Sequence, residues 1–343
     1  MTIDLIITTY KPGKDFLEML DILCNQSLPI NKIIIMNTEQ KYFERIAYEK
    51  TFLAKHNNIE VRHVSKLEFD CGKTRNMGVK LSDADYFLMI SQNAMPVGRD
   101  FLQTLYAPFE KDSEIGVTYA CQLPAEDANI ITASEKKFLF PETSHTYSDK
   151  DLSTFGPDIY FISNGAALYK RSVFDKLNGF SNHGILNEDI LYGAALINAG
   201  YKIAYVAEAK VLYSKNRTLE EYEHHYFDLG VSHAKHPEVY AQDKFKENSK
   251  ILYKATLDAL SKVKDRKQIK ASKKIEKAKK KNYKKGRKYR QLPMSVIYKL
   301  TGSKEYWKRD ERLRDRSSLD AHAGYGRSEA EIVMIKDNPI AKN

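Results

Sequence analysis

The stretch Leu5-Ile6-Ile7-Thr8-Thr9-Tyr10 decides the fold that this sequence predicts. It is a short apolar run rich in β-branched residues, and Lys11-Pro12-Gly13 ends it with a turn, so we expect a buried strand. Apolar residues at helical spacing follow over residues 16–24, and Ile33-Ile34-Ile35-Met36 is a second buried strand. With a helix at 42–55 and a strand at 59–64, this alternation predicts a parallel sheet with crossover helices.

The same alternation of strands and helices continues along the chain. It predicts an α/β fold in which a mostly parallel, Rossmann-like sheet is flanked by helices, and such sheets bind ligands at the carboxyl ends of their strands. Residues 123–154 are polar and irregular, which indicates a long active-site loop or a helical insertion. The further predicted strands are 86–90, 116–121, 159–169, 202–206 and 210–213, and the further helices are 73–81, 99–109 and 186–199.

The charge of the chain is concentrated in one segment. The 343 residues carry a formal net charge of +10, yet residues 262–290 alone hold 16 Lys and Arg against two acids, which leaves the rest mildly acidic. From about residue 219 the pattern is helical, with aromatic residues among the charges. We therefore expect two parts: an α/β domain at 1–240 and a basic helical extension at 241–343.

Cysteine usage and the chain start predict the compartment. Cys24, Cys71 and Cys121 are few, odd in number and without metal-ligand spacing, which favours reduced thiols in a reducing compartment. The first residues lead directly into a strand with no signal-peptide pattern, and no apolar stretch approaches the ~18 residues of a spanning helix. We expect a cytoplasmic protein that is able to lie on a membrane surface.

Polar residues follow several of the predicted strands, and together they carry a family resemblance. The tracts are Thr8-Thr9-Tyr10, the run from Phe69 to Asn76, Ser91-Gln92-Asn93-Ala94, and Asn187-Glu188-Asp189 after Gly179-Phe180. Over roughly residues 1–235 the chain resembles the inverting family 2 glycosyltransferases of GT-A fold, in the bacterial rhamnosyltransferase branch. The resemblance implies transfer of L-rhamnose from dTDP-rhamnose onto a glycan or lipid-linked saccharide, in cell-wall or capsular polysaccharide synthesis.

The nucleotide side of the site is expected at the first strand end and in the tract around Asp70. Thr9 and Tyr10 suit the base and ribose, and Asp70 can accept hydrogen bonds from either, although it also suits a helix N-cap. The guanidinium of Arg75 suits phosphate, or a structural ion pair. The resemblance implies nucleotide-sugar contacts from Thr9, Tyr10, Asn37, Asp70, Lys73, Arg75, Asn76, Gln92, Ser163, Asn164 and Gly165.

The metal side departs from the pattern of the family. Asn93 stands where the branch usually has an aspartate that helps to hold Mg²⁺ or Mn²⁺ on the diphosphate, and an Asn carbonyl brings no charge. Tyr213 and Lys215 stand where the branch tends to have histidines. Either the metal is held weakly or Lys215 offsets the phosphate charge in its place. The alternative is that Lys215 is a solvated surface lysine.

The base is expected at the start of the helix over 186–199. Inversion needs one group that takes the proton of the acceptor hydroxyl as its oxygen attacks, and the resemblance implies Asp189 as that base, with Glu188 as its neighbour or an acceptor contact. The alternative is that this tract only caps the helix. His233 is a candidate acceptor contact. The histidines from 224 to 236 do not have the spacing of a zinc site.

Two questions stay open at the level of sequence. The basic tract suits a solvated amphipathic helix, a nucleic-acid contact or an anionic membrane surface; we favour the inner face of the cell membrane, because no nucleic-acid module accompanies it. The departures at Asn93, Tyr213 and Lys215 also leave a second function class. In that class the chain is a non-catalytic glycosyltransferase-like protein that binds a nucleotide or a partner in a polysaccharide-assembly complex.

Overall fold

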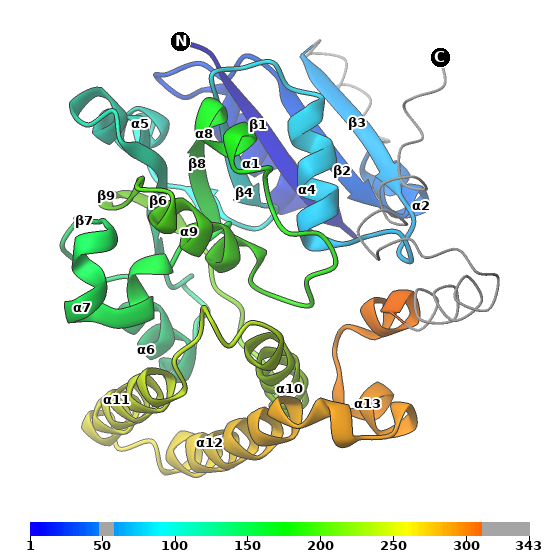
Figure 1. Ribbon diagram of the computed structural model, residues 1–343, viewed down its shortest axis with the longest axis vertical. Helices are drawn as coiled ribbons and strands as arrows, with labels where there is room; N and C mark the ends of the chain where they lie inside the picture. Colours follow the sequence, from blue (N-terminus) through cyan, green and yellow to red (C-terminus); the bar gives the residue numbers. More distant parts are fainter. Residues whose placement is uncertain (48–57, 311–343) are drawn as a thin grey trace. The chain divides into compact units, whose positions relative to one another are not determined.

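The computed structural model describes residues 1–47 and 58–310. Residues 1–302 form one compact unit, and a second unit begins at Ser303. Within the described ranges, the first unit is built on one mixed sheet of nine strands (Figure 1). Its strands are ordered β3-β2-β1-β4-β8-β6-β9-β5, and β7 pairs with β9 off this path.

The first four strands are parallel, as the sequence predicts. Residue Leu5 of β1 pairs with Ile33 of β2 on one side and with Leu88 of β4 on the other. Both faces of β1, β2 and β4 are buried, which is why these three are largely continuous apolar runs, whereas β3 at the edge of the sheet is partly exposed and carries polar residues. The strands are β1 (Ile3–Tyr10), β2 (Ile33–Thr38), β3 (Ile59–Val64) and β4 (Tyr86–Ser91).

Alternate residues of these strands pack against helices on the two faces of the sheet. Leu5 and Ile7 contribute to a core formed with α1 (Lys14–Cys24) and α5 (Phe101–Lys111), whereas Ile6 contributes to a core formed with α4 (Cys71–Lys80) and α9 (Glu188–Asn198). Helix α2 (Gln40–Ala47) and helix α8 (Arg171–Lys176) complete this part. The predicted helix at 42–55 extends into residues 48–57, outside the described residues.

The second half of the sheet differs from the predicted pattern: the strands expected at 202–206 and 210–213 are one strand, β5 and β7 were not expected, and β8 is shorter than predicted. Strand β8 covers only Ala166–Lys170 and runs antiparallel to β4 and β6. The run at 159–169 was predicted as strand, but Gly156-Pro157 starts a 3₁₀ turn over Gly156–Tyr160, and polar residues 163–165 separate the turn from the strand. The remaining strands are β5 (Met95–Pro96), β6 (Ile115–Leu123), β7 (His145–Tyr147) and β9 (Lys202–Leu212).

Residues 123–154 contain a helical insertion, one of the two forms expected. Helix α6 (Ile130–Leu139) packs against the C-terminal helices, and Ile131, Tyr222 and Leu260 form a small shared core. The other elements here are the 3₁₀ turn Asp149–Asp151 and α7 (Leu152–Phe155). The C-terminal helices are α10 (Leu219–Lys235), α11 (Gln242–Lys262), α12 (Arg266–Arg287) and α13 (Met294–Leu300), and a 3₁₀ turn at Tyr289–Gln291 precedes α13.

Helices α10 and α12 approach closely through two glycines. A Cβ added at Gly230 would lie 2.4 Å from the Tyr283 carbonyl oxygen, and one added at Gly286 would lie 2.1 Å from the Phe227 carbonyl oxygen. The basic helix α12 therefore packs tightly on α10 within the unit of residues 1–302. The part boundary expected near residue 240 stays a prediction. Among the described helices, none combines the length and apolar character needed to cross a membrane.

Candidate active site

A pocket of about 350 Å³ opens at the carboxyl ends of β1 and β4. Four predicted residues line it: Thr9, Tyr10, Gln92 and Asn93. The side-chain amide of Gln92 forms two hydrogen bonds with Tyr10, accepting from its backbone N–H at 2.9 Å and donating to its carbonyl at 3.0 Å. The other lining residues are Thr8, Thr38, Lys66, Phe69, Ser91 and Tyr213.

Asn37 lies behind this pocket and supports its wall. The Thr9 hydroxyl donates to Asn37 Oδ1 at 3.0 Å, and Asn37 Nδ2 lies 2.9 Å from His63 Nδ1. Asn37 is fully buried and Thr9 nearly so. Tyr10 is exposed and packs edge-on against Tyr42, so its ring is available to a flat ligand such as a base.

The tract from Asp70 to Asn76 supports neighbouring segments through several of its side chains. Asp70 is the N-cap of α4 and accepts from the backbone N–H of Lys73 at 2.9 Å. Asn76 accepts from the Phe180 N–H at 3.0 Å and donates to the Phe180 carbonyl at 2.8 Å. For both residues the structure shows the structural alternative: Asp70 caps α4, and Arg75 forms an ion pair with Glu188.

The acidic pair Glu188–Asp189 begins α9 after a turn residue in the left-handed region. Asn187 has φ 64° and its side chain makes no hydrogen bond that caps the helix. Asp189 Oδ2 accepts from the Asn164 backbone N–H at 3.1 Å, and Oδ1 accepts from the Ile190 N–H at 3.0 Å. Two fixed donors from different segments therefore orient this carboxylate.

Burial and the neighbouring Glu188 carboxylate raise the pKa of Asp189 to about 7, against the lowering effects of Asn164 N–H and Arg75. An acid whose pKa lies near neutrality is suited to take up and release a proton under physiological conditions. Glu188 is held differently, by Arg75 and by the side-chain amide of Asn164 at 3.3 Å. The two adjacent carboxylates therefore have separate environments, and Asp189 is the one suited to proton transfer.

Ser163, Asn164 and Gly165 lie between the acidic pair and a group that the sequence did not reveal. Gln122 donates to the Ser163 hydroxyl at 2.6 Å, and a Cβ on Gly165 would meet the Gln122 side chain at 2.1 Å. Gly165 is thus in close contact with Gln122, and its implied contact with the nucleotide sugar stays a prediction. Lys136 of α6 in turn donates to Gln122 Oε1 at 2.6 Å.

Lys136 brings an uncompensated positive charge close to the pocket. Its Nζ lies 4.6 Å from the ring centre of Tyr213, which lines the pocket beside Asn93. No carboxylate among residues 1–47 and 58–310 forms an ion pair with it, and burial lowers the pKa of its ammonium to about 8. The polar character of residues 123–154 did not single it out. The sequence signal that could have found Lys136 is its spacing of four residues from Phe140, typical of one helix face. In the structure Lys136 also faces the Phe140 ring.

The residues around Asn93 do not fit a resident divalent cation. Mg²⁺ and Mn²⁺ favour carboxylate oxygens, but no acidic side chain lines this pocket, and Asn93 offers one neutral carbonyl. Over the described part of the chain, no three His, Cys, Asp or Glu side chains are grouped so as to hold a metal. Lys215 is exposed and forms an ion pair with Glu221 at 2.5 Å, which matches the surface-lysine alternative.

His233, predicted as an acceptor contact, lies in the packing between α10 and α12. Its ring stacks on Tyr240 at 3.8 Å and its Nδ1 lies 3.0 Å from the Tyr283 hydroxyl. Burial lowers the pKa of His233 to about 3, so it stays neutral. The observed role is a packing one, and acceptor contact stays a prediction.

The fold and this site define a protein of GT-A architecture, with a ligand pocket at parallel strand ends and an oriented carboxylate at the start of α9. The chain belongs to the family described as "Glycosyl transferase family 2", whose profile residues 4–177 match. It is 36% identical over 238 residues to the O-antigen chain rhamnosyltransferase RfbN of Salmonella typhimurium, covering 69% of this chain and 74% of the relative. It is 34% identical to the O-antigen chain rhamnosyltransferase WbaN of Salmonella anatum, covering 68% and 72%.

Solved structures agree in fold. One is the mannosyltransferase PcManGT from Pyrobaculum calidifontis in complex with GDP-Man and Mn²⁺, with a TM-score of 0.50 and 15% identity over 76% of this chain and 72% of that one. Another is S. aureus TarS 1–349 in complex with UDP-GlcNAc, with the same TM-score and identity over 85% and 92%. At this identity they bear on the fold alone, and they confirm the predicted GT-A class. The family match and the two relatives show that the chain is a glycosyltransferase, as the resemblance carried by the polar tracts implies.

Proposed function

We propose that this chain transfers L-rhamnose from dTDP-rhamnose, with inversion, onto a glycan or lipid-linked saccharide during O-antigen-type polysaccharide synthesis. The donor sugar and the pathway class are supported by two relatives named O-antigen chain rhamnosyltransferases. The chemistry is carried by one observation: Asp189 is fixed by two backbone N–H groups and its pKa is raised to about 7.

In the proposed reaction Asp189 accepts the proton of the acceptor hydroxyl as that oxygen bonds to the anomeric carbon. The bond from this carbon to the diphosphate oxygen breaks on the opposite face, and its electron pair leaves with the nucleoside diphosphate. Glu188, held by Arg75, acts as a positioning residue that keeps the pKa of Asp189 high. Thr9, Tyr10 and Gln92 form the wall of the pocket for the nucleotide.

We assign to Lys136 the stabilisation of the negative charge on the leaving diphosphate. Lys136 lies beside Tyr213 at the pocket and has no acidic partner among the described residues. A fixed cation placed where charge develops lowers the barrier without a metal ion. Asn93 offers only one neutral oxygen to Mg²⁺ or Mn²⁺, and we assign no step to either ion.

The test of this function is Asp189→Asn assayed with dTDP-rhamnose and an O-antigen-type saccharide acceptor. We expect kcat to fall by about 10²–10⁴-fold, the range that general bases contribute, while dTDP binding is retained. Asp175→Asn, at an exposed carboxylate of α8, is the matched control and should keep full activity. Full turnover in Asp189→Asn would remove Asp189 from the reaction. Stable dTDP binding by wild type without any transfer would favour the non-catalytic alternative.

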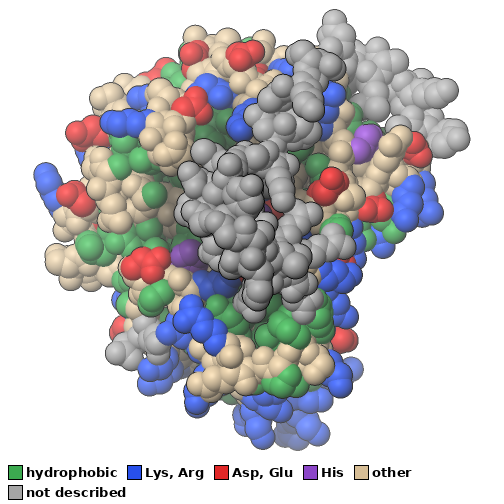
Figure 2. Space-filling model, turned by 45° about the vertical axis from the view of Figure 1, so that its right-hand side comes forward, with side chains coloured by type: hydrophobic (Ala, Val, Ile, Leu, Met, Phe, Trp, Pro, Cys, Tyr) green, Lys and Arg blue, Asp and Glu red, His purple; other side chains and the backbone are tan. Residues whose placement is uncertain are grey.

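We also infer that the enzyme works at the inner, cytoplasmic face of an anionic membrane. Exposed Lys and Arg side chains gather at the lower end of the view in Figure 2, where Figure 1 shows α11 and α12. Each such charge near an anionic surface contributes roughly 1 kcal/mol at low screening. Sedimentation with anionic vesicles at low and high salt tests this placement, and binding that does not depend on salt would contradict it.

A further inference from the structure

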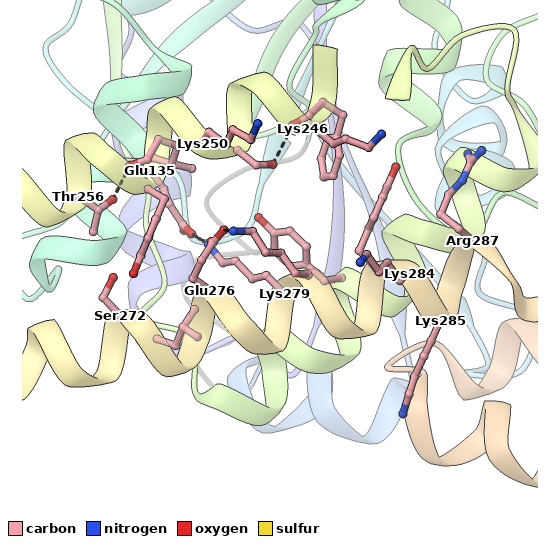
Figure 3. A pocket seen from close by; sticks show the side chains of 18 of the residues that line it. Glu135, Lys246, Lys250, Thr256, Ser272, Glu276, Lys279, Lys284, Lys285 and Arg287 are labelled. Atoms are coloured by element: carbon pink, nitrogen blue, oxygen red, sulfur yellow. Dashed lines mark hydrogen bonds and ion pairs between the residues drawn. The ribbon is translucent and has the colours of Figure 1, made fainter. Parts of the chain in front are cut away.

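A large, mainly apolar cavity lies between α11 and α12 and is also lined by residues of α10 and α6. It has a volume of about 1020 Å³. This is at the upper end of the ~300–1,000 Å³ typical of small-molecule sites. Figure 3 shows it with α11 above and α12 below. Its apolar lining comes from four helices and the segment after α12: Ile131, Tyr226, Phe245, Leu252, Tyr253, Ile275, Tyr283 and Leu292.

The acids inside this cavity are neutralised by lysines. Glu135 of α6 and Lys279 of α12 form an ion pair of 2.7 Å, and both side chains are largely buried. Glu276 pairs with Lys280 at 2.9 Å, one turn along the same helix. Lys279 also faces the rings of Tyr222 and Tyr226. The interior is therefore close to neutral, and an apolar ligand would meet no unpaired carboxylate there.

The rim of the cavity carries cations without acidic partners. Lys250 of α11 and Lys284 and Lys288 at the end of α12 all line it. None of these three forms an ion pair with any acid in the described portions of the chain. An apolar interior with a cationic rim is complementary to a molecule that has a hydrocarbon chain and an anionic head.

We propose that this cavity binds the hydrocarbon chain of a phosphate-bearing lipid taken from the membrane, with the phosphate held by the lysines of the rim. Burial of each methylene contributes about 0.8 kcal/mol, so a chain of a dozen carbons supplies substantial affinity beyond the charge. A nucleic acid would use the cations but leave the apolar interior exposed. A neutral lipid would use the interior but leave the lysines unpaired.

Helix α6 connects this cavity to the donor side of the active site. Glu135 faces the cavity and pairs with Lys279, while the next residue, Lys136, faces Gln122 and Tyr213. A lipid in the cavity would therefore lie on the other side of one helix from the donor pocket. This gives the occupant a role, as the lipid end of the acceptor, and that role rests on the proposed function. The binding itself does not.

General attraction of the basic tract to an anionic surface would not need the cavity. Binding in the cavity and attraction to the surface can therefore be distinguished by experiment. The probe is dodecyl phosphate, below its critical micelle concentration, titrated into the full chain by calorimetry. Dodecyl maltoside has the same chain without the charge, and inorganic phosphate has the charge without the chain. We expect saturable binding of dodecyl phosphate, weaker binding of dodecyl maltoside and none of phosphate alone.

Two kinds of variant locate the site. Ile275→Trp fills the cavity and should abolish binding, and Lys284→Gln with Lys288→Gln should weaken it by about tenfold or more. The matched control is Lys273→Gln with Lys274→Gln, two exposed lysines of the same helix that do not line the cavity. Thermal unfolding verifies that Ile275→Trp folds. If Ile275→Trp does not fold, Ser249→Trp fills the cavity from α11 instead.

Three results would overturn the proposal. They are unchanged affinity in the filled variants, equal loss in the control pair, and equal binding of inorganic phosphate and dodecyl phosphate. Because these measurements need neither donor nor turnover, they are independent of catalysis. A chain that binds dodecyl phosphate but transfers no sugar would refute the transferase function and leave the lipid site standing.

Discussion

The guanidinium of Arg75 forms an ion pair with the carboxylate of Glu188, residues that lie 113 positions apart in the sequence. Both side chains are mostly buried, with 15% and 8% of their surface exposed. The pair joins the middle of α4 to the start of α9, next to Asp189. The tract that the family resemblance connects with the nucleotide is thereby connected to the expected base.

Replacement of Arg75 by glutamine should destabilise the protein. Removal of one partner of a buried ion pair leaves the other charge unpaired, at a cost of roughly 3–5 kcal/mol. We expect a clearly lower thermal unfolding temperature for Arg75→Gln. The double variant Arg75→Gln with Glu188→Gln should recover part of the loss, because no charge is then left alone.

The matched control for this pair is Arg62, which pairs with Glu60 at the surface and is 60% exposed. Exposed pairs contribute about 0–1 kcal/mol, so Arg62→Gln should unfold close to wild type. If Arg75→Gln unfolded at the same temperature as wild type or as Arg62→Gln, the pair would have no role in stability.

The raised pKa of Asp189 predicts the rising limb of the pH profile. A base acts when deprotonated, so kcat/KM should increase as pH rises through about 7. Glu188→Gln removes a charge that raises this pKa and leaves the cation of Arg75 to lower it, so the midpoint should move to lower pH. Glu221→Gln, at an exposed carboxylate paired with Lys215, should leave the midpoint unchanged. A midpoint that moves upward in Glu188→Gln would contradict the assignment.

Much of the fold could be predicted from the sequence because β1, β2 and β4 are buried on both faces. Such strands are continuous apolar runs, as in Ile33–Thr38, and periodicity identifies them. Ile159–Tyr169 was assigned too much strand, because a 3₁₀ turn with buried Ile159 and Tyr160 has the same apolar pattern as a strand. Burial alone does not distinguish the two.

The sequence predicted site residues whose type and place at a strand end indicate a chemical role. It was less able to predict residues whose role depends on a contact formed only in the folded chain. Thr9, Tyr10, Gln92 and Asn93 were placed by strand ends, and the structure brings them into one pocket. The pairing of Asn76 with Phe180 depends on a crossing of distant segments that no local pattern reveals. Lys136 was missed for the same reason, since only the folded chain brings α6 to Gln122.

Introducing a carboxylate in place of Asn93 should increase the response to divalent cations. Asn93→Asp adds a charged oxygen ligand to a pocket that has no acidic side chain. We expect Mn²⁺ to tighten dTDP binding more in Asn93→Asp than in wild type, measured by calorimetry with and without the ion. Asp83→Asn in the turn after α4 serves as a control for handling and folding. Equal Mn²⁺ responses in Asn93→Asp and wild type would show that position 93 does not face the diphosphate.

Lys136 should set the falling limb of the same pH profile. Burial lowers the pKa of its ammonium to about 8, so its positive charge is present below that pH and is lost as pH rises through it. If this charge stabilises the departing diphosphate, activity should fall above about pH 8 in wild type. Lys136→Arg stays charged and should extend the plateau to higher pH, provided that the larger guanidinium still reaches the pocket.

Neutralisation of the same residue separates a catalytic role from a structural one. Lys136→Gln should lower kcat by about 10²–10³-fold, the loss seen when one stabilising donor is removed, and should abolish the falling limb. The affinity for dTDP should change much less, because the charge matters most as the bond breaks. The adjacent exposed Lys137→Gln is the matched control and should behave as wild type. A Lys136→Gln enzyme that keeps both its rate and its falling limb would assign the charge of the leaving group to another residue.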